Sequence, residues 1–139
     1  MTTIYALARV CYKNECLPLD PDLTTIMRES RNYDSLLFAW KGWHEATGRK
    51  MRPIFAETVK LLNKDARENG YDDLSVRWLE EFEEENFEKT FDSLFEQIKP
   101  LYQLLHSHVK RRLDLYYRDK YPANHNSSLI PAHLLSNFI

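Results

Sequence analysis

The sequence predicts an all-α protein built from antiparallel helices, one of them long and kinked by a proline. Only three glycines occur in 139 residues, so tight turns are few. Apolar residues recur at three- and four-residue steps over most of the chain, which is the period of a helix that is buried on one face. A composition of 43% hydrophobic and 29% charged residues is typical of globular proteins.

The first predicted helix follows the cysteine-containing start of the chain. Asp20 has the residue type of an N-cap, Pro21 suits the first helical position, and the helix should run to about residue 30. A second helix is expected over residues 33–47, and the next residue, Gly48, suits its C-terminal cap.

A third helix is expected from about residue 52 to Asn69, with Gly70 as its stop. A fourth, short helix should span roughly residues 73–83, with Leu74 and Trp78 on its apolar face.

The fifth predicted helix begins after a cap at Asn86 and dominates the chain. Its apolar stripe consists of Phe87, Phe91, Leu94, Phe95, Ile98, Leu101, Tyr102, Leu105, Val109, Leu113 and Tyr116. Pro100 should kink this helix rather than end it, because the stripe continues in register on both sides.

The length of the fifth helix bears on the size of the folded body. It would span about 50 Å, whereas a compact globule of this chain length has a radius of gyration of roughly 14 Å. The helix therefore belongs either to an extended hairpin or coiled coil, or to a larger body. Residues 129–139 begin a new apolar element without a cap, which favours the larger body and a chain that is cut short.

Charge and hydropathy restrict the partners. The chain carries 19 basic and 21 acidic residues, so no positive surface for nucleic acid is expected. No apolar run reaches the roughly 20 residues of a membrane span, and residues 1–8 lack the pattern of a signal peptide.

The two cysteines, Cys11 and Cys16, enclose four residues. Zinc and redox pairs typically enclose about two, and no second Cys or His pair stands nearby, so a short disulfide is favoured. A disulfide requires an oxidising compartment. Either the thiols are free, or the true N-terminus, with its export signal, is absent.

None of the histidines forms a metal site by sequence pattern. His44-Glu45 begins like H-E-x-x-H, but Gly48 stands where the second histidine is needed. His106 and His108 are two residues apart, so their side chains diverge by about 200° on a helix. Surface or packing roles are expected for all three histidines.

The remaining candidates also have simple structural interpretations. The basic run 110–112 fits a solvated helix face, and the acidic run 80–85 fits the start of the fifth helix, because it lacks the Asp/Asn and Gly pattern of a calcium loop. Asn126-Ser127-Ser128 is a candidate N-glycosylation acceptor, although such triplets also arise by chance and their use requires export.

Several ordered segments of the chain are distinctive as strings of residues. They are Cys16-Leu17-Pro18-Leu19-Asp20-Pro21-Asp22-Leu23, Ala39-Trp40-Lys41-Gly42-Trp43, Asn69-Gly70-Tyr71, Pro100-Leu101-Tyr102 and Ile130-Pro131-Ala132-His133-Leu134-Leu135. In this order, and over about residues 8–137, they resemble the angiotensin-converting enzyme (peptidyl-dipeptidase A) family of zinc peptidases. The resemblance implies a large helical domain, secreted or on the outer face of the plasma membrane, that removes C-terminal dipeptides from oligopeptides. Residues 1–139 would then be a partial domain, truncated at both ends, that packs against the remainder of its own domain.

In this family a zinc ion is held by two histidines and a glutamate, and the glutamate of H-E-x-x-H activates water. The resemblance places all of these residues downstream, so this chain would supply scaffold helices and be inactive alone. It also implies a Cys11–Cys16 disulfide. His44 and Phe82 stand where some members have a chloride-binding Arg and Tyr, which argues against activation by chloride. The alternative is a non-catalytic helical binding protein derived from the same family.

Overall fold

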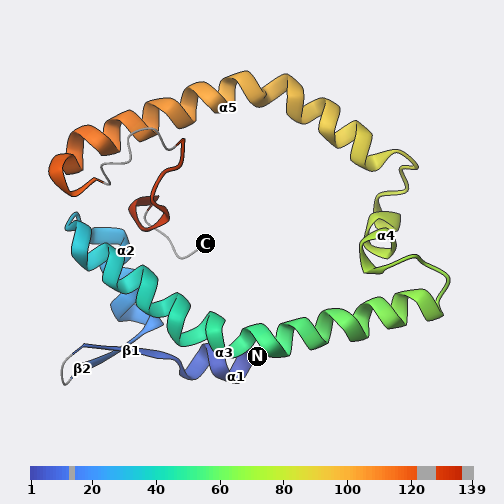
Figure 1. The fold of residues 1–139 in the computed structure, drawn as a ribbon, viewed down its shortest axis with the longest axis horizontal. Helices are drawn as coiled ribbons and strands as arrows, with labels where there is room; N and C mark the ends of the chain where they lie inside the picture. Colours follow the sequence, from blue (N-terminus) through green and yellow to red (C-terminus); the bar gives the residue numbers. More distant parts are fainter. Residues whose placement is uncertain (13–14, 122–127, 136–139) are drawn as a thin grey trace. The chain divides into compact units, whose positions relative to one another are not determined.

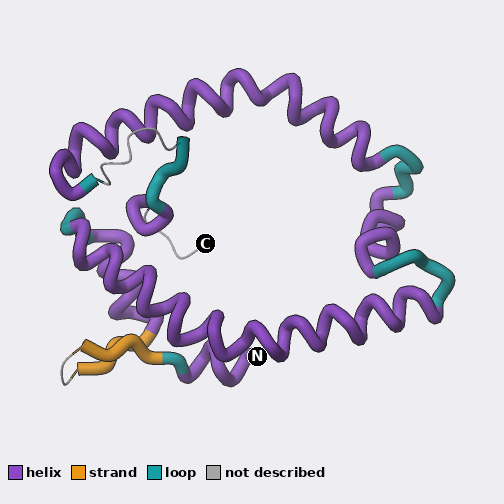
Figure 2. The backbone as a smooth tube through the Cα atoms, viewed as in Figure 1, coloured by secondary structure: helices purple, strands orange, loops and turns teal. Residues whose placement is uncertain are grey.

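The computed structural model describes residues 1–12, 15–121 and 128–135. This part of the chain is mainly helical, as predicted, and its strands form one short hairpin (Figures 1 and 2). The chain divides into unit 1, Met1–Ile54 with Lys110–Ile139, and unit 2, Phe55–Val109. The boundaries fall inside the two long helices, α3 (Tyr33–Glu68) and α5 (Phe87–Tyr117).

The N-terminal segment contains two short β-strands, which the sequence did not predict. After the short helix α1 (Thr2–Leu7), strands β1 (Arg9–Tyr12) and β2 (Glu15–Pro18) pair antiparallel. The sequence pattern had indicated only a cysteine loop in this region. Each strand has four residues, and Val10 is the buried residue of β1, so the alternation that reveals a strand has too few positions to show.

The first predicted helix is shorter than expected. Helix α2 covers Thr24–Glu29, and one turn of π-helix, Leu19–Leu23, precedes it. Asp20 has the extended backbone expected of a capping residue (φ −114°, ψ 133°). Its carboxylate accepts a hydrogen bond from the Thr24 hydroxyl at 3.2 Å.

The second and third predicted helices are one helix of 36 residues, α3, so the predicted stop at Gly48 is wrong. A glycine inside a helix costs only about 1 kcal/mol. The helical register also continues across the glycine, from Trp43 and Thr47 to Met51. Pro53 lies inside the same helix, although its missing N–H removes one helical hydrogen bond.

The fourth predicted helix is also shorter. Helix α4 is Leu74–Leu79, followed by a 3₁₀ turn, Glu80–Phe82, which ends at Glu83 in a left-handed conformation (φ 50°). Helix α5 begins where expected and continues through Pro100. Two more 3₁₀ turns, Arg118–Lys120 and Ala132–Leu135, follow it.

Unit 1 contains the core. Its buried apolar residues are Ala8, Val10, Leu23, Met27, Leu36, Ala39, Trp43, Tyr121 and Leu134. They come from the hairpin and the residue before it, from α2 and the turn before it, from the first half of α3, and from the segments that follow α5. The hairpin packs closely on α3, because a Cβ added at Gly42 would lie 2.4 Å from Val10 Cγ1. Tyr5 also meets the Trp43 ring edge-on at 5.1 Å.

Unit 2 has almost no core of its own. Every residue of Phe55–Val109 is described, and Ala66 is the single one that is buried. The apolar stripe of α5 lies at the surface, and its exposed members in this unit include Phe91, Leu94, Phe95, Ile98, Leu101, Tyr102 and Leu105. No helix of the described residues is long and apolar enough to cross a bilayer.

Candidate functional site

The hairpin brings the two cysteines together. Cys11 on β1 lies directly opposite Cys16 on β2, and a disulfide joins them. The bond closes the hairpin whose Val10 side chain packs against α3, so its place is structural. This outcome agrees with the pairing that the family resemblance implies and excludes free thiols in this structure.

His44 makes its contacts within its own helix. Its Nδ1 lies 2.7 Å from the Trp40 carbonyl oxygen, a geometry in which Nδ1 carries the proton and donates. The His44 and Trp40 rings pack at 4.0 Å. This arrangement fits the packing role expected for His44.

Phe82, the other residue that the resemblance compares with a chloride site, packs on the start of α5. It stacks on Phe87 with 4.3 Å between ring centroids, and it is 58% exposed. His44 belongs to unit 1 and Phe82 to unit 2, and each has its aromatic partner within its own unit. Only the family resemblance therefore argues against activation by chloride.

The described residues offer no cluster of metal-ligating side chains. Among residues 1–12, 15–121 and 128–135, no group of three or more His, Cys, Asp or Glu side chains could hold a metal ion. His106 lies beside the Tyr102 ring on α5, with 6.0 Å between centroids. The candidate acceptor Asn126 lies outside the described residues.

The acidic run lines a hollow of about 540 Å³ in unit 2. Glu80 at this hollow accepts a hydrogen bond from the Tyr71 hydroxyl, and that bond raises the pKa of Tyr71. Glu80, Glu83, Glu84 and Glu85 line this hollow and are exposed, so their carboxylates form a solvated acidic surface.

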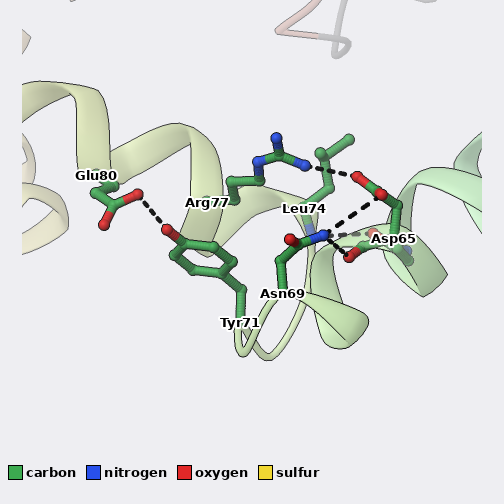
Figure 3. Close-up of polar contacts among 7 residues, drawn as sticks. Asp65, Asn69, Tyr71, Leu74, Arg77 and Glu80 are labelled. Atoms are coloured by element: carbon green, nitrogen blue, oxygen red, sulfur yellow. Dashed lines mark hydrogen bonds and ion pairs between the residues drawn. The ribbon is translucent and has the colours of Figure 1, made fainter.

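A polar cluster that the sequence analysis missed joins the end of α3 to α4 (Figure 3). Arg77 Nη1 lies 2.6 Å from Asp65 Oδ2, and Asn69 Nδ2 donates to the Asp65 carbonyl oxygen at 2.8 Å. Asn63 Oδ1 accepts the backbone N–H of Leu74 at 3.1 Å. These contacts fix the turn between the two helices.

Asp73 caps the N-terminus of α4 in the same region. Its Oδ1 accepts the backbone N–H groups of Ser75 at 2.8 Å and Val76 at 3.2 Å. The Ser75 hydroxyl bonds to the same oxygen, and together these bonds lower the pKa of Asp73. The predicted start of the fourth helix is therefore correct, and Asp73 is a cap that the sequence pattern had not singled out.

Comparison with known proteins identifies the family of the chain, which the described side chains alone do not identify. A family described as angiotensin-converting enzyme matches residues 1–139. The chain is 45% identical to the angiotensin-converting enzyme of Sus scrofa over 139 residues and 42% identical to that of Mus musculus over 138 residues. Each alignment covers 99% of this chain and 10% of the relative.

A shorter relative shows the same agreement. The angiotensin-converting enzyme of Theromyzon tessulatum is 42% identical over 144 residues, which is 99% of this chain and 23% of that protein. The chain thus spans between a tenth and a quarter of the relatives named here. By the match over all of its residues, this chain belongs to the angiotensin-converting enzyme family.

Proposed function

We propose that this chain is a scaffold segment of a zinc-dependent peptidyl-dipeptidase, an enzyme that removes C-terminal dipeptides from oligopeptides. Family membership supports the reaction class. The small share of each relative that the chain covers supports a role as one part of a larger catalytic domain. By family resemblance, that domain would be secreted or would face the outside of the cell. The zinc ligands would then be residues beyond these 139.

The bare apolar stripe of α5 is the observation that carries this proposal. Ile98 is 59% exposed and Leu101 is 70% exposed, although both lie on the continuous apolar face of an amphipathic helix. Such a face is normally buried, and a large exposed apolar patch marks an interaction surface. The remainder of the same catalytic domain is the proposed cover.

Dye binding by the purified chain tests whether this face lacks a cover. We expect the chain to bind the hydrophobic dye ANS and to self-associate, and the variant Ile98→Asp to lose much of both. Gln103→Asp is the matched control, because it adds the same charge to the same helix away from the stripe. Equal loss in both variants, or no dye binding by the unmodified chain, would count against the proposal.

The alternative, a non-catalytic helical binding protein, makes the opposite prediction. A finished binding protein should be monomeric, bind little dye and unfold cooperatively. A dipeptide-release assay with and without a metal chelator gives a second test, because chelator-sensitive activity of the chain alone would contradict a purely scaffolding role. A reading frame that continues into H-E-x-x-H would exclude the alternative.

A further inference from the structure

A hollow of about 290 Å³ lies in unit 1, between the start of α3 and the end of α5. Its polar lining includes the side chains of Arg31, Arg112, Tyr116 and Tyr117, together with Ser30. All of these residues belong to unit 1. The volume lies just below the range for drug-sized ligands, which is roughly 300–1,000 Å³, so only a small ligand would fit.

The lining carries positive charge without an acidic residue. Arg31 Nη1 donates to the carbonyl oxygens of Arg28 at 3.1 Å and Ser30 at 2.8 Å, which hold the guanidinium in place while its other N–H groups remain available. Arg112 brings a second guanidinium. Asp34, near the start of α3, is already paired with Lys120.

The tyrosines add neutral hydroxyl groups. Burial raises the pKa of Tyr117, and the charge of Arg31 opposes that rise only in part. Tyr117 therefore keeps its proton at neutral pH and can donate a hydrogen bond. Its ring also meets Tyr33 edge-on at 5.8 Å, which limits the orientation of the ring.

The apolar lining restricts the class of anion. Leu36 is 2% exposed and Leu134 is 5% exposed, and Leu113 also lines the hollow. A fully hydrated inorganic anion would lose water against these side chains without compensation. A carboxylate attached to an apolar group can bury that group against the leucines and place its oxygens beside the guanidiniums that line the hollow.

We propose that this hollow binds small organic carboxylates that carry an aromatic or aliphatic group, with Arg31 and Arg112 binding the carboxylate. This site goes beyond the proposed function and does not rest on it, because every residue involved lies in unit 1 and none takes part in peptide hydrolysis. The proposal can therefore fail while the family role stands.

Titration of the intact chain with phenylacetate tests the site. By calorimetry or ligand-observed NMR we expect millimolar or tighter binding, and at least about tenfold weaker binding of the neutral analogue phenylacetamide, because the amide lacks the charge that the guanidiniums recognise. Inorganic phosphate should also bind at least about tenfold more weakly, because it has no apolar group. These comparisons use the unmodified chain and so do not depend on the folding of any variant.

The variant pair Arg112→Ala and Arg111→Ala locates the binding. Both arginines are exposed, but Arg112 lines the hollow and Arg111 does not. We expect Arg112→Ala to weaken phenylacetate binding about tenfold and Arg111→Ala to leave it unchanged, with equal helix content by circular dichroism. Absence of phenylacetate binding, equal binding of the amide or phosphate, or equal loss in both variants would each overturn the proposal.

Discussion

The two units differ in how much of their helices is buried, although α3 and α5 run through both units. In unit 1, α3 buries Leu36, Ala39 and Trp43 beneath the hairpin, α2 and the segments that follow α5. In unit 2, the remainder of α3 buries only Ala66, and α5 buries none of its residues. The apolar period is equally clear in both units. Periodicity therefore identifies the face of a helix that will be covered, but not which part of the chain covers it.

The largest expected effect separates the two units directly. Met27 in unit 1 is 1% exposed, so Met27→Ala should reduce the free energy of unfolding by about 2–5 kcal/mol through lost contacts and a cavity. Leu101 in unit 2 is 70% exposed, and Leu101→Ala should change that free energy by less than about 0.5 kcal/mol. Urea denaturation followed by circular dichroism measures both. Similar values for the two variants would show that α5 is covered in solution.

The same distinction explains which structural features the sequence could predict. The start of α5 after Asn86 and its passage through Pro100 were predicted because both depend on local pattern. The hairpin was missed because its strands are short, and the continuity of α3 through Gly48 was missed because a helix tolerates a single glycine when the register continues.

The polar contacts show the same limit. The pairing of Asp65 with Arg77 depends on how the turn between α3 and α4 folds back, and no sequence spacing specifies it. By contrast, the disulfide could be predicted from the sequence, because Cys11 and Cys16 are the two cysteines of the chain. The hollow at Arg31 and Arg112 could not be predicted from the sequence. Its lining comes from segments about eighty residues apart, which only tertiary packing brings together.

An intermediate effect is expected where the hairpin meets α3. A Cβ at Gly42 would lie 2.4 Å from Val10 Cγ1, so Gly42→Ala should destabilise unit 1 by about 1–3 kcal/mol through overpacking. Gly48→Ala is the matched control on the same helix. Nothing lies within 4 Å of a Cβ at Gly48, so this change should stabilise the chain by roughly 0.5–1 kcal/mol.

The double variant Val10→Ala with Gly42→Ala identifies the contact responsible. Truncating Val10 removes the Cγ1 atom that the new methyl group meets. The cost of Gly42→Ala should therefore be smaller in the Val10→Ala background than in the unmodified chain. A cost that does not depend on Val10 would mean that the hairpin does not rest on this part of α3.

The smallest effect is expected from pH, because protonation adds one charge without removing any packed atom. His133 is 5% exposed, its ring meets Tyr33 edge-on at 4.6 Å, and its Nε2 has no hydrogen-bond partner in the described chain. Burial lowers the pKa of His133 below its ordinary value of 6.5. The unfolded chain therefore takes up this proton at a higher pH than the folded chain does.

The free energy of unfolding should therefore not depend on the protonation of His133 above about pH 6.5, where the ring is neutral in both states. It should decrease as the pH falls from 6.5 to the lowered pKa of the folded state. Urea denaturation at a series of pH values measures the slope. His133→Gln should remove it, whereas His108→Gln, a change on α5, should leave it in place. If the unfolding free energy of His133→Gln still depended on pH in this range, the pH dependence would belong to another group. The His133 ring would then be hydrated at the edge of the unit 1 core.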